Sequence, residues 1–353
     1  MPANLKTVGL VAAAAAAAVL VGSGVSLVTA IRLWKKVRSG GYKLSGKTVV
    51  ITGGSRGLGL AIARQCVGQG ARVAIIARDP HALDRARLIL NRGQHENVIA
   101  ISCDVTDKGQ VEGAFEVVRK KFGPIDVLVN NAGLITVGPM ESMTLDDFRD
   151  SLNLHFWAPL YTTLAVLPEM RLRKQGRIVN ISSIGGKISV PHLLPYSAGK
   201  FALAGFSEGV RTEVAKDNIY VTSVYPGLMR TGSPRNATFK GRHRAEYAWF
   251  SVSDSMPGIS MSADRAARQI VSACRRGDSI LIVSLPAKVA ITLHQLFPRA
   301  SSSVLDAVNR AFPAVGGIGK ESRLGKESAS WVSPSLLTAL DEFAARKNNE
   351  AAV

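Results

Sequence analysis

Short apolar runs alternate with longer amphipathic stretches over residues 41–285. The runs are rich in β-branched residues and are bounded by glycine or polar residues, so each is predicted to be a buried strand. The predicted strands are KTVVIT (47–52), ARVAIIAR (71–78), NVIAISCDV (97–105), IDVLVNNAG (125–133), GRIVNISS (176–183) and IYVTSVYPG (219–227). Because helical patterns fill the gaps, the chain is predicted to be an α/β protein with a doubly wound parallel sheet in one domain.

Residues 1–40 follow a different pattern and are predicted to lie outside this domain. Thr7 to Ile31 carries no charged residue, and a transmembrane helix needs about 20 apolar residues. The basic residues Arg32, Lys35, Lys36 and Arg38 follow directly. Positive flanks stay in the cytoplasm, so we expect a single-pass membrane anchor with the main domain cytoplasmic. A cleaved signal peptide is the alternative, although its apolar region usually has only about 7–15 residues.

Residues 286–353 are predicted to form an extension of the domain. The stretch LPAKVAITLHQLFP (285–298) is apolar over much of its surface, and it could lie on a membrane, line the substrate site or contact a second subunit. GKES occurs at 319 and again at 325 among glycines and serines, which is typical of a flexible linker. A short helix is predicted from Pro334, with Ser333 as its cap.

Charge and cysteine content exclude some classes of function. The 353 residues carry a formal net charge of +18, which would suit a nucleic-acid partner, but the charge is spread along the chain and only 6% of residues are aromatic. Residues 1–78 contain no acidic residue, and a basic flank beside an apolar segment suits an anionic membrane better than a duplex. Cys66, Cys103 and Cys274 are too widely spaced to suggest a metal site or a disulfide framework.

The segment TGGSRGLG after the first predicted strand is typical of a phosphate-binding turn. Gly53, Gly57 and Gly59 allow a tight turn and a close approach of the backbone to a pyrophosphate. The helix that follows would point its free N–H groups at the phosphates. A glycine-rich turn alone has no such meaning; its position between a strand and a helix favours dinucleotide binding.

The segment YSAGK places Tyr196 and Lys200 on one face of a predicted helix. Most pairs of this kind are simply two solvated residues, so the pair gains meaning only from its surroundings. TGGSRGLG (52–59), NNAG (130–133), ISS (181–183), YSAGK (196–200) and PGLMRT (226–231) occur in this order, with Ser183 13 residues before Tyr196. In these motifs the chain resembles the short-chain dehydrogenase/reductase superfamily. The resemblance covers most of residues 41–285 and implies a Rossmann-type fold, a nicotinamide cofactor and carbonyl–alcohol chemistry.

The end of the second predicted strand bears on the choice of cofactor. Relatives that prefer NAD carry an acid there for the ribose 2′-hydroxyl, whereas this chain has Arg78. Arg56 in the glycine turn is placed for the same 2′-phosphate. Two basic residues and no acid favour NADP(H); the alternative is two solvated arginines.

Further cofactor contacts are implied by the resemblance alone. Ser55 and Leu58 belong to the glycine turn, and Asp104 and Val105 match the pair that borders the adenine. The remaining matches line the ribose and the nicotinamide carboxamide: Asn131, Ala132, Gly133, Pro226, Gly227 and Thr231.

The catalytic roles follow from proton chemistry and from the resemblance. Hydride belongs to the cofactor, and the protein supplies position and a proton. Tyr196 is the expected general acid in reduction and base in oxidation, since a nearby ammonium and an oxidised nicotinamide would lower its pKa from about 10. Lys200 supplies that charge and by resemblance binds the nicotinamide ribose. Ser183 is expected to donate a hydrogen bond to the substrate oxygen.

One position departs from the family pattern. Aligned on its PL and LPEM segments, the chain has His155 where relatives carry an asparagine that holds a water for proton transfer to the lysine. Asn153 lies two residues earlier, about 200° away on a helix. The histidine backbone or ring could serve the relay; a packing histidine is an equal alternative.

The residues after Thr231 sit where relatives keep a substrate lid. Arginines, Lys240 and aromatic residues are mixed there without a clear period, which suits either a lid over an apolar, acidic substrate or a solvated loop. The anchor favours a lipophilic carbonyl or alcohol substrate, and relatives suggest a homo-oligomer. The alternative function is a non-catalytic dinucleotide-binding sensor or scaffold at a membrane; a nucleic-acid partner is not expected.

Overall fold

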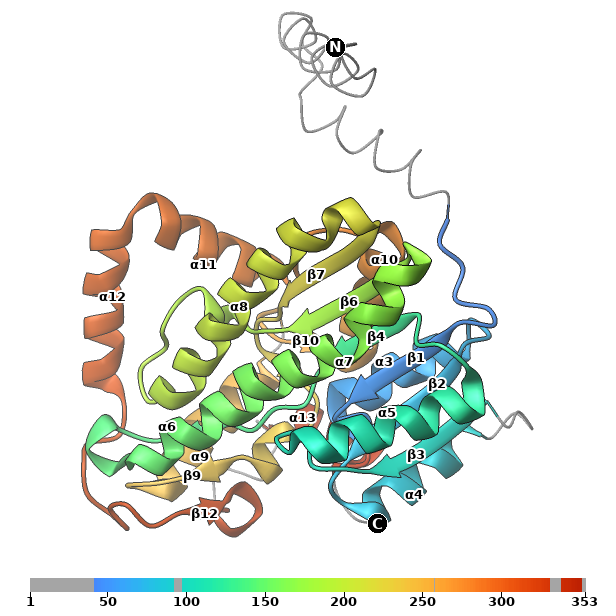
Figure 1. Cartoon of the computed structure of the whole chain (residues 1–353). Helices are drawn as coiled ribbons and strands as arrows, with labels where there is room; N and C mark the ends of the chain where they lie inside the picture. The colour runs from blue at the N-terminus through green and yellow to red at the C-terminus, as the bar shows by residue number, and fades with distance from the viewer. Residues whose placement is uncertain (1–40, 92–96, 257, 331–337, 351–353) are drawn as a thin grey trace, which may run out of the picture. The chain divides into compact units, whose positions relative to one another are not determined.

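The computed structural model describes residues 41–91, 97–256, 258–330 and 338–350 (Figure 1). The chain divides into two compact units, Met1–Lys43 and Leu44–Val353. The predicted anchor over residues 7–31 lies outside the described residues. Among the described helices, none combines the length and the apolar character needed to cross a bilayer.

A seven-stranded sheet forms the centre of the Leu44–Val353 unit. Its strand order is β11-β7-β6-β4-β1-β2-β3, and every neighbouring pair is parallel. The strands are β1 (Thr48–Thr52), β2 (Arg72–Ala77), β3 (Val98–Ser102), β4 (Val127–Asn130), β6 (Gly176–Ile181), β7 (Ile219–Tyr225) and β11 (Ile280–Ile282). The doubly wound parallel sheet is therefore confirmed. All six predicted strands are present, and β11 was not predicted.

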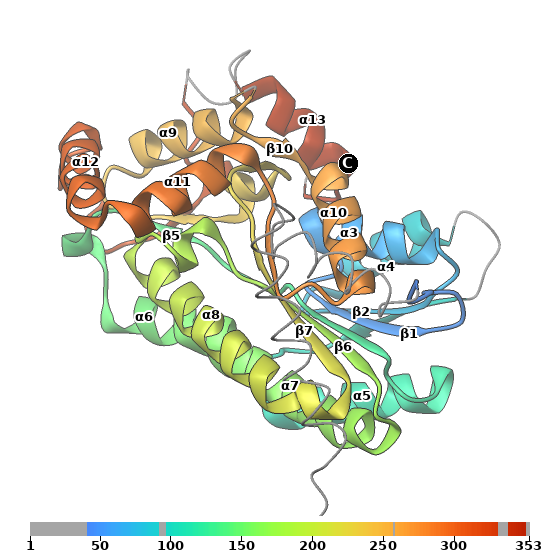
Figure 2. The same cartoon turned by 90° about the horizontal axis from the view of Figure 1, so that it is seen from above.

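Helices cover both faces of the sheet (Figure 2). One face carries α3 (Gly57–Val67), α4 (Pro80–Leu90) and α10 (Ala263–Arg276), and the other carries α5 (Lys108–Phe122), α7 (Ala158–Arg173) and α8 (Leu194–Val214). The order reverses at β1, because β2 and β3 lie on one side of it and β4, β6 and β7 on the other. Ligands of such sheets bind at the carboxyl ends of the strands beside this reversal.

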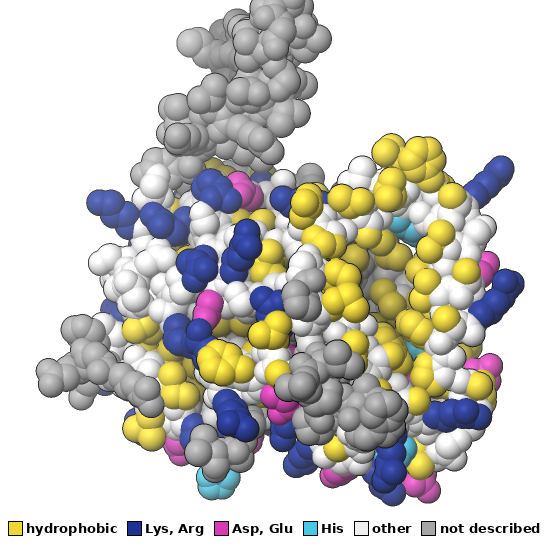
Figure 3. All heavy atoms as spheres, turned by 180° about the vertical axis from the view of Figure 1, so that it is seen from behind, with side chains coloured by type: hydrophobic (Ala, Val, Ile, Leu, Met, Phe, Trp, Pro, Cys, Tyr) yellow, Lys and Arg dark blue, Asp and Glu magenta, His cyan; other side chains and the backbone are white. Residues whose placement is uncertain are grey.

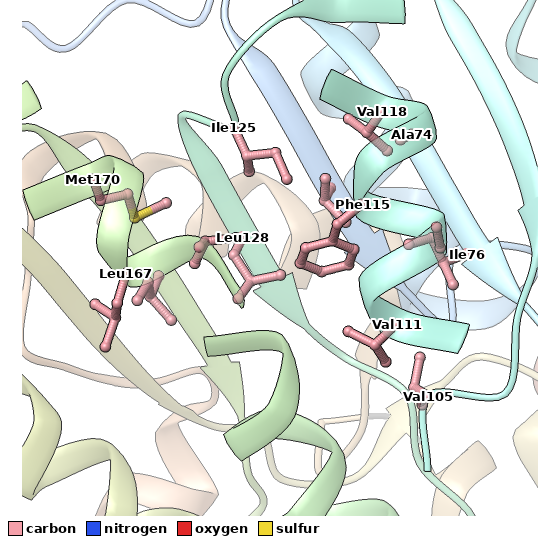
Figure 4. Close-up of a cluster of buried hydrophobic side chains, with 14 of the residues drawn as sticks. Ala74, Ile76, Val105, Val111, Phe115, Val118, Ile125, Leu128, Leu167 and Met170 are labelled. Carbon is pink, nitrogen blue, oxygen red and sulfur yellow. The ribbon is translucent and has the colours of Figure 1, made fainter. Parts of the chain in front are cut away.

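The largest part of the core lies between the sheet and α5 and α7 (Figure 4). Phe115 of α5 and Leu128 of β4 are fully buried there, together with Met170 of α7. These side chains recur on one face of each helix, which is why the amphipathic stretches fold against the strands. The core fixes the strand ends that carry the site.

Smaller elements cover the carboxyl ends of the strands. A three-stranded sheet combines β5 (Thr136–Val137), β9 (Thr238–Phe239) and β12 (Arg323–Leu324), and β8 (Met229–Arg230) pairs with β10 (Met261–Ser262). The helices in this region are α6 (Leu145–Leu152), α9 (His243–Ser255), α11 (Leu285–Leu296), α12 (Pro298–Ala311) and α13 (Ala339–Lys347).

The segment predicted as a flexible linker is instead ordered against the lid. β12 pairs antiparallel with β9, the Gly325 N–H donates to the Ala237 carbonyl over 2.9 Å, and Ser328 is buried. Composition did not reveal this, because the contacts are non-local. The helix predicted from Pro334 falls in residues 331–337, outside the described residues.

Candidate active site

A cavity of about 440 Å³ opens at the carboxyl ends of β1, β4 and β6. Most of the predicted cofactor and catalytic residues line it: Gly53, Ser55, Arg56, Gly57, Leu58, Arg78, Asp104, Val105, Asn131, Ala132, Gly133, Ser183, Tyr196, Lys200, Pro226, Gly227 and Thr231. Gly59 and His155 are absent from this lining. The fold thus gathers residues from seven separate stretches of the chain at one place.

The glycine turn is packed too closely to accept side chains. A Cβ on Gly59 would lie 2.1 Å from the carbonyl oxygen of Gly53, and one on Gly53 would lie 2.8 Å from Ala132 Cα. Gly53 and Gly57 also have positive φ angles of 64° and 57°. These glycines bring the N-terminus of α3 close to the end of β4, and the N-terminus of a helix is a favourable place for a phosphate.

Asn131 and Thr52 join the glycine turn to the next strand end. The Asn131 side-chain amide donates to the carbonyls of Thr52 and Gly53, both at 3.1 Å. The Thr52 hydroxyl accepts the N–H groups of Asn131 and Ala132 at 3.0 and 3.1 Å. These hydrogen bonds hold the NNAG segment in register with TGGSRGLG, so the two predicted motifs form one wall.

Arg78 and Arg56 are the two basic residues at the outer end of the cavity. Both are exposed and both line it. The Asp79 carboxylate, which follows Arg78, accepts the N–H groups of His81 and Ala82 as the cap of α4. Asp79 is therefore committed to a helix terminus, and the exposed Arg78 gives this end of the cavity positive charge, whereas Arg56 faces the carboxyl group of Glu350, with 3.5 Å between Arg56 Nε and Glu350 Oε2.

Ser183, Tyr196 and Lys200 meet at the inner end of the cavity. The Ser183 and Tyr196 side chains are hydrogen-bonded, and Ser183 Oγ also accepts the Gly185 N–H at 3.0 Å. Lys200 is buried, and its Nζ donates to the Ile181 carbonyl at 2.9 Å and lies 5.6 Å from the centre of the Tyr196 ring. α8 provides Tyr196 and Lys200 one turn apart, and the end of β6 provides Ser183.

Burial changes the acidity of this group. It raises the pKa of Tyr196 to about 12, although the hydrogen bond from Ser183 acts in the opposite direction. It lowers the pKa of Lys200 to about 7, because the ammonium loses its hydration. The lowering of the Tyr196 pKa that we expected from Lys200 is therefore outweighed by burial among these side chains, and the phenol carries its proton at neutral pH.

His155 lies beside this group, in a π-helical turn over Asn153–Trp157. Its ring meets the Tyr196 ring edge-on, with 5.3 Å between the centroids. The Ser151 hydroxyl donates to the Pro195 carbonyl at 2.6 Å and so accepts from His155 Nδ1 at 3.1 Å, while the Leu134 N–H faces Nε2 at 3.4 Å. These partners assign the proton to Nδ1. Burial and then the charge of Lys200 hold the His155 pKa well below its usual range, so the ring is neutral.

Residues 47–240 match the family described as short chain dehydrogenase, which is more than half of the chain. This chain belongs to the short-chain dehydrogenase family. It shares 39% identity over 188 residues with the 3-dehydrosphinganine reductase of Danio rerio, covering 52% of this chain and 57% of that protein. It shares 35% identity over 280 residues with a dehydrogenase/reductase SDR family protein 7-like of Anopheles gambiae, covering 77% and 86%.

A solved structure gives the same fold as this short-chain dehydrogenase. The L-sorbose reductase of Gluconobacter frateurii, complexed with NADPH and L-sorbose, matches with a TM-score of 0.62 and 30% identity over 69% of this chain and 97% of that one. Members of this family are oxidoreductases that bind a nicotinamide dinucleotide and interconvert carbonyl and alcohol groups.

The lid of this short-chain dehydrogenase is an ordered helix rather than a solvated loop. Tyr247 and Phe250 of α9 are buried, and Trp249 and Phe250 line the cavity. Two basic lid residues are paired elsewhere, since Lys240 lies 2.6 Å from Asp147 and Arg235 lies 2.9 Å from Glu342. Helix α9 thus adds apolar side chains to the cavity, whereas the charges of Lys240 and Arg235 are matched by carboxylates of other segments.

Sequence reasoning missed two acidic residues in the cavity. Asp254 of α9 is buried, and its surroundings raise its pKa well above the usual range. Glu350 lines the cavity from residues far outside the five motifs. Neither belongs to a local pattern, because both reach the site through packing of distant segments.

Proposed function

We propose that this short-chain dehydrogenase interconverts a carbonyl and a secondary alcohol on a lipophilic substrate, with NADP(H) as the cofactor. The observation that carries the proposal is the meeting of Ser183, Tyr196 and Lys200 in a cavity whose other end is formed by the glycine turn and two arginines. The residues fit the cofactor, since a glycine-packed helix N-terminus accepts phosphates and Arg56 and Arg78 offer charge to a 2′-phosphate. When bound, the cofactor would supply or accept the hydride.

Within this proposal each side chain has one task. The Ser183 hydroxyl donates a hydrogen bond to the substrate oxygen, and Tyr196 gives that oxygen its proton during reduction and removes it during oxidation. Lys200 holds its ammonium 5.6 Å from the Tyr196 ring and binds the ribose of the cofactor. During reduction Tyr196 loses its proton to the substrate. His155, which lies beside Tyr196, helps to return a proton to it through its neutral ring or its backbone.

The lining of the inner cavity supports an apolar substrate. Ile135, Val190, Leu193, Trp249 and Phe250 face the space around Tyr196. Apolar pockets with few polar groups bind ligands mainly by burial of hydrocarbon. A relative is named for reducing 3-dehydrosphinganine, and a long-chain ketone would suit this lining.

The test is NADPH oxidation by detergent-solubilised protein across a panel of lipophilic ketones and aldehydes. We expect turnover with long-chain substrates and a loss of at least about 100-fold in kcat for Tyr196→Phe, as befits a general acid. NADPH binding should persist in that variant. Full activity in Tyr196→Phe would contradict the assigned role, and tight NADPH binding without any turnover would favour the sensor function.

We also propose that the protein works at a membrane surface. Leu285, Val289 and Leu293 follow one another on α11 at four-residue spacing, and each is about half exposed or more, at 72%, 49% and 49%. α12 carries no buried residue and exposes Val304 and Val308. Figure 3 shows hydrophobic side chains gathered over these two helices around a hollow in the surface.

Charge favours lipid over a second copy of the chain as the partner of this apolar face. No acidic residue occurs between Asp278 and Asp306, whereas Lys288 and Arg299 are exposed. Anionic headgroups would attract this region, and two copies placed face to face would repel one another.

A single dye tests this contact, because all three native cysteines are buried. Leu293→Cys would carry an environment-sensitive dye, and Leu172→Cys on α7, exposed by 87%, would be the matched control. With anionic vesicles we expect a blue shift and quenching by brominated acyl chains at position 293 only. Equal responses at both positions, or none at 293, would refute the membrane contact.

A further inference from the structure

The segment over residues 338–350 runs from the lid to the glycine turn. α13 packs so tightly on Gly232 that a Cβ there would lie 2.4 Å from Ala345 Cα. The Asp341 carboxylate accepts the Gly232 N–H at 2.9 Å. These contacts fix the end of the helix above the N-terminus of α3.

The next residues bind the glycine turn directly. The Asn348 carbonyl accepts the Gly57 N–H at 2.9 Å. The Asn349 side-chain amide donates to the carbonyls of Ser55 and Ala82 at 2.8 and 3.0 Å. A segment almost 300 residues away in the sequence thus takes the Gly57 N–H, a donor that the turn would otherwise offer to a phosphate, and is held in place by the two bonds of Asn349.

Glu350 places a buried carboxyl group beside Gly57 and Arg56 of the glycine turn. One of its oxygens lies 3.5 Å from Arg56 Nε and 2.6 Å from the Asn236 side-chain nitrogen. The other lies 2.6 Å from the point where a Cβ of Gly57 would stand, and Thr231 is next to that point at 4.0 Å. The side chain is only 5% exposed. The Glu350 carboxyl group therefore lies between the helix N-terminus and Thr231, at the place where such a turn accepts a phosphate.

We propose that residues 348–350 compete with the phosphate groups of the dinucleotide for the glycine turn, so that the cofactor binds only when this segment moves away. The inference rests on the proposed cofactor site. The Gly57 N–H has one proton to donate, and Arg56 is already paired. The Glu350 side chain fills the space beside Gly57, so a phosphate has no room at that place while the segment is docked. The segment acts as an internal substitute for the cofactor's phosphates and lowers the apparent affinity for it.

The opposite arrangement, in which the segment closes over a bound dinucleotide, gives the opposite result in hydrogen exchange. The full-length protein would be measured with and without saturating NADPH, following the amides of residues 338–350. Competition predicts faster exchange in this segment when NADPH is bound. Slower or unchanged exchange would overturn the proposal, and this measurement needs no substitution.

Direct binding provides the second test. The double variant Asn349→Ala, Glu350→Ala removes the side-chain contacts with Ser55, Ala82, Arg56 and Asn236 without altering any residue of the glycine turn. We expect NADPH fluorescence titration to give at least a tenfold lower Kd than for the native chain. The control is Glu321→Ala, which removes an acidic side chain from an exposed position where it forms an ion pair with Arg323; it should leave the Kd unchanged.

The outcomes separate this inference from the function on which it rests. Equal NADPH binding by the native chain and the double variant, or weaker binding by the variant, would reject competition and leave the reductase function intact. A failure of both proteins to bind NADPH or NADH would reject the cofactor site and the competition together.

Discussion

The ring of His155 lies edge-on against the ring of Tyr196, with 5.3 Å between their centroids. His155 Nε2 and Lys200 Nζ also approach the same point, since a Cβ on Gly133 would lie 3.3 Å from the former and 3.7 Å from the latter. The histidine therefore borders both the proposed acid and the lysine beside it. This position supports the proposed part of His155 in proton transfer, at the place where the family carries an asparagine.

Substitution of His155 separates a relay from simple packing. His155→Asn should keep kcat within about threefold, because a polar side chain and the backbone remain, whereas His155→Ala should lower kcat by about tenfold or more. The measurement is the pH profile of kcat with NADPH saturating. His81→Ala, at an exposed position on α4, is the control. Equal losses in the Asn and Ala variants, with unchanged pH profiles, would identify a packing residue.

The acidity of Tyr196 predicts how the two directions depend on pH. Burial raises its pKa to about 12, so the phenol needed for reduction is present throughout the neutral range. Oxidation needs the phenolate, whose fraction grows about tenfold per pH unit below the pKa. We expect kcat/KM for alcohol oxidation to rise with pH between 7 and 9 with a slope close to one. A plateau below pH 9 would show that the bound cofactor and Lys200 lower the pKa well below that of the buried phenol.

Most of the sheet was predictable because its strands are local patterns. The runs around Val50, Ile75 and Val129 are β-branched, apolar and bounded by turn residues, so they predict strands by themselves. β11 was missed because only Ile280–Ile282 pairs with β7, and the apolar helix α11 follows soon after. A short apolar run of this kind does not distinguish a strand from a helix.

The candidate site likewise contains residues that could be predicted from local motifs and residues that could not. Glycines, Ser183, Tyr196 and Lys200 occur in local motifs whose spacing gives their roles, and the fold only brings them together. The place of Glu350 depends on the docking of α13 against Gly232, and the place of Asp254 depends on the folding of the lid. Such contacts are non-local, and no periodicity in the sequence encodes them. The π-helical turn at His155 was missed for the same reason, since α8 packs against it at Gly199, where a Cβ would lie 3.0 Å from His155 Cβ.

Arg78 should decide the choice between the two nicotinamide cofactors. A charge-assisted hydrogen bond to a 2′-phosphate is worth about 1.5–3 kcal/mol, so Arg78→Ala should weaken NADPH binding by about 10- to 100-fold. NADH lacks that phosphate, and its affinity should change little. Fluorescence titration with both cofactors gives the ratio of the Kd for NADPH to the Kd for NADH in each protein. Arg87→Ala, on the exposed face of α4 beside Asp84, is the control. An equal loss of affinity for NADPH and NADH would show that Arg78 does not bind the 2′-phosphate.

Two glycines provide a matched test of the packing in the glycine turn. A Cβ on Gly59 would lie 2.1 Å from the Gly53 carbonyl and 2.6 Å from the Asn131 side chain. Gly59→Ala should therefore lower the free energy of unfolding by about 1–3 kcal/mol and abolish NADPH binding. Gly113 lies within α5, and no atom lies within 4 Å of its Cβ position. Gly113→Ala should therefore raise the free energy of unfolding by about 0.5–1 kcal/mol. Urea unfolding measures both; a Gly59→Ala variant as stable as the native chain would contradict the close packing.

The affinity for NADPH should rise with pH because of Glu350. Burial raises the pKa of this carboxyl to about 7, and Asp341 acts in the same direction, whereas Arg56 and the hydrogen bond from Asn236 oppose it. A pKa raised in the docked segment means that docking is strongest when Glu350 is protonated and weakens as pH rises through about 7. Between pH 6 and pH 8 the competition should therefore weaken by about tenfold, since one pKa unit corresponds to a factor of ten.

The 2′-phosphate also titrates in this range, so the measured quantity is the ratio of the NADPH Kd of the native chain to that of Glu350→Ala. That ratio should fall on going from pH 6 to pH 8. A ratio that rises with pH would mean that the charged carboxylate, rather than the protonated one, holds the segment on the glycine turn through Arg56.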